Sequence, residues 1–317
     1  MKIITHEDII KLNISPKTCL EWVEDMLKNR EKSQNPPKIH LRPYDGVFCN
    51  VMPCIVDMQD LSRGMGLKVV TRFPNQVPSV DSKLILLDAK SGAYLAVMDA
   101  NWITTMRTGM IAAHSANLFG KKDFKTISIM GLGNTGRATM LGLAEIIKNR
   151  NITVKLLKYK GQEELFKERF SYLKNFKFEF VNSYIEAIEN TDIVLSAVTY
   201  FKDDICPDKY FKEGITVIPI HTRGFTNCDL FFDKVFVADI PPARDFKNFD
   251  KFKKLGVTND VVNGLIPGRE NDSERILVYN MGLAINDVNF ANQIYNMLDK
   301  SKLQEIDFKA PKEKFYI

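Results

Sequence analysis

The first clear pattern of apolar residues along the chain is that of a helix. From Cys19 to Leu27 apolar side chains recur at helical spacing, in the stretch "SPKTCLEWVEDML". Ser15 is a suitable N-cap residue, and Pro16 suits the first position of a helix. We therefore predict a helix that begins at this serine.

Between Lys38 and Met98 the pattern is that of strands. The segments "KIHLRPY" and "VFCNVMP" flank the turn pair Asp45-Gly46. The segment "GLKVVTRF" follows, and then "KLILLD" and "AYLAVMD" surround a second turn. These features predict a mostly antiparallel sheet. The next stretch, "WITTMRTGMIAAHSANLFG", predicts a helix that Gly120 can terminate.

After Lys121 strand patterns alternate with helix patterns. "TISIM", "ITVKLL", "FKFEFV", "DIVLSAV" and "GITVIPI" read as strands with helical segments between them. This alternation predicts an α/β fold with a Rossmann-type, doubly wound parallel sheet, beside an α+β domain. We place the substrate-binding and dimerisation domain at residues 1–118, joined by a return of 293–317. We place the dinucleotide-binding domain at residues 119–292.

Composition narrows the class of protein. The 317 residues are 45% hydrophobic and 26% charged, and the net charge of +5 is spread along the chain. The absence of a basic stripe argues against nucleic-acid binding. No apolar run reaches the roughly 20 residues of a membrane span, and the start "MKIITHEDII" does not read as a signal peptide. Five scattered cysteines and four histidines favour neither a metal site nor a disulfide framework, and we expect a cytoplasmic protein.

The stretch "ISIMGLGNTGR" contains G-x-G-x-x-G between a predicted strand and a predicted helix. Gly131 permits a tight turn, Gly133 permits close approach of a pyrophosphate, and Gly136 lets the helix pack on the strand. The helix N-terminus offers N–H groups to phosphate. We predict a dinucleotide site, and the alternative is a turn with a purely structural role.

The end of the second strand of this fold bears on the choice of cofactor. An NAD site has an acid there, whereas this chain has "LLKYKGQEE", with Lys158 and Lys160 at the place. The nearest acid, Glu163, lies beyond a glycine. Two lysines suit a 2′-phosphate, so the sequence favours NADP over NAD. The alternative is that both lysines are only solvated.

Lys68 and Arg107 are two cationic side chains of the first domain that lie within predicted secondary structure. Strand alternation places Lys68 among apolar residues, and helical spacing places Arg107 on an apolar face. A buried cation must be paired or bind an anion, so each residue is a candidate for substrate binding or for a structural salt bridge. Lys38 and Arg42 are weaker candidates on one early strand. We interpret His114 as a packed helix residue, and the alternative is a catalytic role.

The sequence resembles the ornithine cyclodeaminase and mu-crystallin family over nearly its whole length. The segments that carry the resemblance are "GLKVVTRFPN", "ILLDAKSGAYLAVMDANWITTMRTG", "GLGNTG", "DIVLSAVT", "NGLIPGREND" and "YNMGLAINDV". The resemblance implies a two-domain homodimer that joins through its first domain, a nicotinamide cofactor, and a small amino or imino acid as substrate.

The resemblance also assigns individual residues by position. Lys68 and Arg107 match the family's substrate-binding lysine and arginine, and Lys38 falls near its earlier arginine. Gly282 and Asp287 belong to the late motif beside the nicotinamide. The residues that match cofactor contacts are Thr108, Asn134, Thr135 and Thr199.

One departure from the family pattern affects the predicted reaction. Cyclodeaminases have an aspartate where this chain has Arg223, and an arginine is a poor base at neutral pH. Asp229 could replace that aspartate only if the loop is remodelled. We therefore expect an NAD(P)-dependent oxidoreductase of amino-acid metabolism, an imine reductase or amino-acid dehydrogenase, with Arg223 suited to an acidic or conjugate substrate. Lys68 and Arg107 are the expected catalytic residues: Arg107 fixes the substrate carboxylate, and Lys68, its pKa lowered by a neighbouring cation and by burial, passes a proton to or from the substrate nitrogen. The alternatives are an ornithine cyclodeaminase and a non-catalytic protein that binds NADP and a small ligand.

Overall fold

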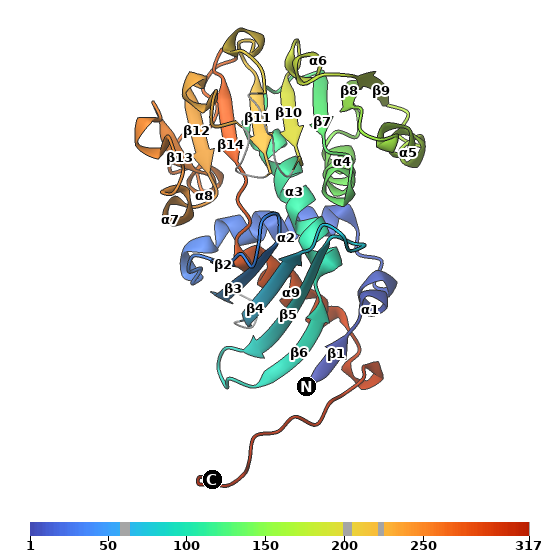
Figure 1. The fold of residues 1–317 in the computed structure, drawn as a ribbon, viewed down its shortest axis with the longest axis vertical. Helices are drawn as coiled ribbons and strands as arrows, with labels where there is room; N and C mark the ends of the chain where they lie inside the picture. Colours follow the sequence, from blue (N-terminus) through green and yellow to red (C-terminus); the bar gives the residue numbers. More distant parts are fainter. Residues whose placement is uncertain (58–63, 199–204, 221–224, 317) are drawn as a thin grey trace. The chain divides into compact units, whose positions relative to one another are not determined.

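The structure, a computed structural model, describes residues 1–57, 64–198, 205–220 and 225–316. Contacts between residues divide the chain into two compact units. The first, which we call the mixed-sheet unit, comprises Met1–Ile14, Asn29–Thr104 and Ala284–Ile317. The second, the parallel-sheet unit, comprises Ser15–Lys28 and Thr105–Leu283. Each is described separately below, with the labels of Figure 1.

The mixed-sheet unit is built on six strands in the order β1-β6-β5-β4-β3-β2. β1 runs parallel to β6, and the other neighbours are antiparallel, so the predicted mostly antiparallel sheet is confirmed. The strands are β1 (Lys2–Ile4), β2 (Ile39–Leu41), β3 (Phe48–Val56), β4 (Gly64–Arg72), β5 (Val80–Asp88) and β6 (Tyr94–Asp99), and the short helices are α1 (His6–Lys11), η1 (Arg30–Lys32) and η5 (Lys300–Lys302).

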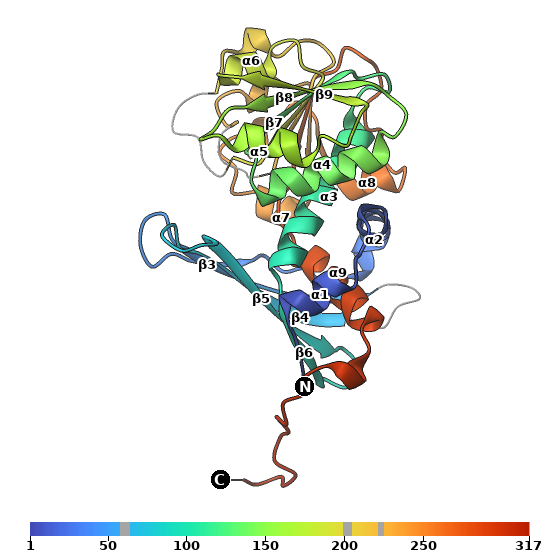
Figure 2. The same cartoon turned by 90° about the vertical axis from the view of Figure 1, so that its right-hand side faces the viewer.

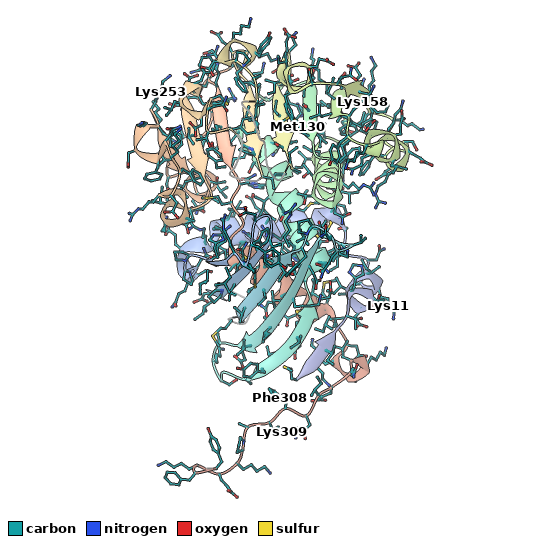
Figure 3. All side chains as sticks on the ribbon, in the orientation of Figure 1. Lys11, Met130, Lys158, Lys253, Phe308 and Lys309 are labelled. Carbon is teal, nitrogen blue, oxygen red and sulfur yellow. The ribbon has the colours of Figure 1, made fainter. Side chains whose placement is uncertain are left out.

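Helix α9 (Ala284–Met297) packs on β3, β4 and β5 of this sheet, and Figure 2 shows it lying along one face. Beyond the helix the chain returns to the sheet edge. The N–H of Ile3 donates to the Gln304 carbonyl, and the N–H of Ile306 donates to the Met1 carbonyl, both at 2.9 Å. The last residues extend from this point with Phe308 and Lys309 exposed, as labelled in Figure 3.

The parallel-sheet unit contains eight parallel strands in the order β13-β12-β14-β11-β10-β7-β8-β9. The order reverses direction at β7, which is the arrangement of a doubly wound Rossmann sheet. The fold class is therefore confirmed. The strands are β7 (Thr126–Met130), β8 (Ile152–Leu157), β9 (Phe176–Val181), β10 (Ile193–Ser196), β11 (Thr216–Pro219), β12 (Lys234–Val237), β13 (Leu255–Val257) and β14 (Ile276–Tyr279).

Helices cover both faces of the parallel sheet. One apolar core joins the strands to α3, α4 and α5, with Ala112, Leu143 and Phe166 among its buried members. A second core joins the opposite face to α6 through Ala187 and Ile188. Figure 2 shows these two layers. The remaining helices and 3-10 turns of the described residues are α2 (Pro16–Lys28), α3 (Asn101–Phe119), α4 (Asn134–Ile146), α5 (Gln162–Arg169), α6 (Tyr184–Ile188), α7 (Ile240–Ala243), α8 (Thr258–Val262), η2 (Asp208–Tyr210), η3 (Asp229–Phe231) and η4 (Phe249–Lys251).

The division into units differs from the predicted boundary between residues 118 and 119. Helix α2 packs on α4 and α8, so it belongs to the parallel-sheet unit. Most of α3 joins it for a steric reason. A Cβ at Gly109 would lie 2.5 Å from Ala138 of α4, and one at Gly142 would lie 2.7 Å from Ala113 of α3. These glycines let the two helices pack backbone against backbone, which ties α3 to the parallel sheet from residue 105 onward.

The C-terminal return also begins earlier than predicted. All of α9, from Ala284, belongs to the mixed-sheet unit, rather than only residues 293–317. Gly66 of β4 explains the close packing, since a Cβ there would lie 2.6 Å from Val288. Within the described residues, none of the helices is long and apolar enough to cross a membrane.

Candidate active site

The glycine turn after β7 shows three different steric environments. A Cβ at Gly131 would lie 2.7 Å from the Ala197 backbone, and its φ of 89° suits glycine. A Cβ at Gly136 would lie 2.2 Å from the Gly131 carbonyl oxygen. At Gly133 a Cβ would meet no atom of the described residues within 4 Å. Packing therefore requires glycine at positions 131 and 136. Position 133 faces open space instead, and a pyrophosphate needs such space to approach the backbone closely.

The turn lies where the parallel sheet changes strand order. β7 pairs with β8 on one side and with β10 on the other, and dinucleotides bind at such switch points. Helix α4 begins at Asn134 with Gly133 as its N-cap, so its first N–H groups have no partner within the helix. Asn134 is exposed and Thr135 is half-buried. This part of the chain fits a nicotinamide dinucleotide.

The predicted lysines at the end of β8 are exposed. Lys158 donates its N–H to the Val181 carbonyl at 2.9 Å, and Figure 3 labels its side chain at this edge. Lys160 lies with its amine 5.2 Å from the Tyr159 ring centroid. Glu163 accepts the Tyr159 N–H at 2.9 Å, and backbone hydrogen bonds lower the pKa of this carboxyl. The nearest acid thus holds the loop together.

Helix α3 carries Arg107 close to the segment that follows β14. The arginine is 6% exposed, and a Cβ at Gly282 would lie 3.2 Å from both terminal guanidinium nitrogens. Gly282 therefore leaves room for the guanidinium over its backbone. Thr108, the next residue, is half-buried. The structure thus brings together two predicted site residues that lie far apart in the sequence.

His114 has a structural partner in the same unit. Its Nε2 lies 2.5 Å from the carboxylate of Glu24 on α2. The hydrogen bond to His114 is the main reason why the pKa of Glu24 is lowered to about 2. Ser115, the next residue on α3, donates to the buried side chain of Asn280 at 3.1 Å. The interpretation of His114 as a packed helix residue agrees with this geometry.

In the mixed-sheet unit, Lys68 is buried beneath α9. It is 1% exposed, and its Nζ lies 2.7 Å from the carboxylate of Asp287, which is fully buried. The structure therefore contains the buried ion pair that was the alternative interpretation of this lysine. The expected neighbour was a cation that would favour deprotonation, but the neighbour is a carboxylate, which favours the ammonium form. The sequence placed Asp287 in the late motif but gave no sign of this pairing.

The other predicted substrate-binding residues that the structure describes differ in how far they are buried. Lys38 is half-buried just before β2, and Arg42 is exposed just after it. Asp229 is 2% exposed, and its oxygens accept hydrogen bonds from Asn248 at 2.7 Å and from Tyr279 at 3.1 Å. Burial raises the pKa of this carboxyl, although the two hydrogen bonds oppose the rise. These contacts favour a structural role for Asp229.

Two predicted residues, Thr199 and Arg223, lie outside the described residues. Across the ranges that the structure does describe, no cluster of three or more histidine, cysteine, aspartate or glutamate side chains is arranged to hold a metal ion. Within the parallel-sheet unit the structure groups the turn residues Gly131, Gly133, Asn134, Thr135 and Gly136, and it pairs Arg107 with Gly282. Within the mixed-sheet unit it pairs Lys68 with Asp287.

The chain matches known proteins over most of its length. It is 26% identical over 326 residues to the nodulation efficiency protein NfeD of Rhizobium meliloti, which covers 96% of this chain and 97% of the relative. It is 25% identical over 327 residues to the alanine dehydrogenase of Archaeoglobus fulgidus, covering 96% and 98%. The fold matches that of Thermococcus litoralis Delta(1)-pyrroline-2-carboxylate reductase in complex with NADH and L-proline, with a TM-score of 0.80, 24% identity, and coverage of 94% and 97%. The model of the ornithine cyclodeaminase/mu-crystallin family matches residues 2–302, and the chain belongs to this family.

Proposed function

We propose that the protein is an NAD(P)-dependent oxidoreductase that acts on a small 2-imino or 2-amino acid. The observation that carries the proposal is the open space beside Gly133, at the switch point of a Rossmann sheet. Packing requires the glycines on either side of it, Gly131 and Gly136. A relative named alanine dehydrogenase and a structural neighbour named pyrroline-2-carboxylate reductase support this class of reaction.

Two buried cations support an anionic substrate. Arg107, held over Gly282, can bind a carboxylate through two parallel hydrogen bonds and so fix the orientation of the substrate. Lys68 supplies a second cation and donates hydrogen bonds to the substrate carboxylate or nitrogen. The bound nicotinamide supplies hydride exchange with the substrate Cα, while the protein sets distance and angle. Arg223 suits a second acidic group on the substrate.

The second candidate is an ornithine cyclodeaminase, which also belongs to this family. Arg223 stands where cyclodeaminases have an aspartate, and a guanidinium beside an ornithine ammonium repels it. Asp229 is committed to Asn248 and Tyr279, which argues against its use as the missing base. We therefore favour the oxidoreductase over the cyclodeaminase. A non-catalytic NADP-binding protein is the third candidate, and it would bind nucleotide without turnover.

The cofactor preference rests on the charge at the end of β8. We expect Lys158→Asp to lower the NADP/NAD preference by about tenfold to a hundredfold, or roughly 1.4–2.8 kcal/mol, because a phosphate-binding cation becomes a ribose-binding acid. The ratio of the two dissociation constants, measured by calorimetry, checks this.

Lys177→Asp is the matched control, because Lys177 is exposed at the opposite end of neighbouring β9, paired in register with Thr153. It should leave the preference unchanged. An unchanged ratio in Lys158→Asp as well would show that Lys158 does not meet the ribose.

We also propose a cytoplasmic homodimer that joins through the mixed-sheet unit, as family membership implies. All five cysteines are free thiols, which suits a reducing compartment. Size-exclusion chromatography with light scattering tests the dimer, and a monomeric mass would contradict it.

A substrate panel tests the proposed reaction. Amino acids, cyclic imines, and keto acids with amines are each incubated with NAD(H) and with NADP(H), and the absorbance of the reduced nicotinamide is followed. We expect cofactor turnover with at least one small imino or amino acid. Nucleotide binding without turnover on any member of the panel would favour the non-catalytic alternative.

A further inference from the structure

We infer that Asp287 is a positioning residue that holds Lys68 as an ammonium and fixes the location of its Nζ. The inference rests on the proposed function for its consequence in catalysis. It assigns Lys68 the role of a permanent cation and hydrogen-bond donor, rather than that of a base. No contact between Asp287 and the substrate is required, because the aspartate acts through the lysine.

Burial makes the pair interdependent. Lys68 is 1% exposed and Asp287 is fully buried, and their charged atoms lie 2.7 Å apart. A lone ammonium in such a place would lose its proton, and a lone carboxylate would gain one, because the charged forms are poorly solvated there. Removing one partner of a buried pair leaves the other as an uncompensated charge.

The backbone of β4 places the helix that carries Asp287. Residues 64, 66 and 68 point to the same face of the sheet, and two of them are glycines. A Cβ at Gly66 would lie 2.6 Å from Val288, and one at Gly64 would lie 3.4 Å from Asn292. The two glycines thus allow α9 to lie close against the strand, with Asp287 in its first turn above Lys68. The ion pair is built into the packing of helix on sheet.

The strand residues paired in register with Lys68 carry no charge that could replace Asp287. On β3 its register partner is Met52, and the buried thiol of Cys54 lies nearby. Burial is the main reason why the pKa of Cys54 is raised, so the thiol stays neutral, and Asp287 reinforces this effect. On β5 the register partner is Leu84, which is apolar. The carboxylate of Asp287 is therefore the group that balances the lysine charge from α9.

A nuclear magnetic resonance titration tests the pair without requiring activity. The side chain of Lys68 is observed in protein with isotope-labelled lysine and assigned by its absence in Lys68→Met. In the wild type we expect the ammonium form to persist well into the alkaline range. In Asp287→Asn the same signal should titrate at least about two pH units lower, because the buried counter-charge is gone. Titration near neutrality in the wild type would overturn the inference, even if the variant fails to fold.

A double-mutant cycle tests the consequence for catalysis. We expect Asp287→Asn to lower kcat/KM about a hundredfold and to move the alkaline loss of activity to lower pH. In the Lys68→Met background the same substitution should change kcat/KM less than about threefold, because the lysine through which it acts is absent. Equal losses in both backgrounds would show that Asp287 does not act through Lys68.

Asp81→Asn is the matched control in the same unit. Asp81 pairs with Lys83 at 2.6 Å, but both side chains are about half exposed. This variant should retain kcat/KM within about twofold, as expected for a surface pair. A wild-type protein that turns over no substrate would contradict the proposed function, while the titration would still decide the role of Asp287.

Discussion

Replacing Gly133 by valine is expected to abolish nicotinamide dinucleotide binding in a protein that remains folded. Among the described parts of the chain, a Cβ at this position meets no atom within 4 Å, and the residue has a φ of −74°, which any amino acid adopts. The valine methyls would instead fill the space that a pyrophosphate needs. We expect affinity for both NADH and NADPH to fall by at least about a hundredfold, or roughly 2.8 kcal/mol.

Calorimetry with each nucleotide and a thermal melt of the same sample check this expectation. Gly133→Ala, which adds a single methyl group, should give an intermediate loss. Gly136→Ala provides the contrast, because its Cβ would lie 2.2 Å from the Gly131 carbonyl oxygen. That variant should lower the melting temperature, whereas Gly133→Val should not. Normal NADH binding by Gly133→Val would mean that the glycine turn is only a structural turn.

Replacing Arg107 by methionine is expected to lower kcat/KM for an imino or amino acid by about a thousandfold, or roughly 4 kcal/mol. Methionine occupies a similar volume but cannot pair with a carboxylate. The buried guanidinium makes charge-assisted hydrogen bonds that are stronger than neutral ones, and burial limits competition from water. Affinity for NADH should change little, because the glycine turn is unaltered.

Arg107→Lys separates charge from geometry. Lysine keeps the positive charge but lacks the planar fork, so we expect a loss smaller than that of the methionine variant but still clear. Arg169→Met, at an exposed position on α5, is the matched control and should retain full activity. Steady-state kinetics and a melting curve are measured for all three variants. Full activity of folded Arg107→Met would remove Arg107 from the substrate site.

The parts of the fold that could be predicted from the sequence depend on local signals. Glycine spacing, an N-cap at Ser15 and alternating apolar residues act within a few residues of each other. The N–H of Thr18 does donate to the Ser15 hydroxyl, and the glycine turn lies between a strand and a helix as predicted. The strands β12, β13 and β14 were not predicted, because each has only three or four residues and shows no clear alternation. The equally short strands β10 and β11 were predicted because they lie in longer apolar runs, "DIVLSAV" and "GITVIPI".

The parts that could not be predicted depend on contacts between distant segments. Gly109 and Gly142 look like ordinary helix residues in the sequence, yet they determine which unit receives α3. The pairing of Lys68 with Asp287 joins a strand to a helix near the opposite end of the chain. A motif that resembles the family's indicates that such a residue matters, but only the packing of α9 on β4 shows what it contacts.

Transfer of deuterium from labelled cofactor to product tests the central claim most directly. In one incubation, the enzyme receives NADH or NADPH carrying deuterium at the nicotinamide C4, together with the imino acid that gives the highest rate. In a parallel incubation, it receives ornithine and the oxidised cofactor. We expect an amino acid that carries the deuterium at Cα, with one cofactor oxidised for each product molecule, and little proline from ornithine. Rapid conversion of ornithine to proline with no net change in the cofactor would contradict the oxidoreductase assignment and identify a cyclodeaminase.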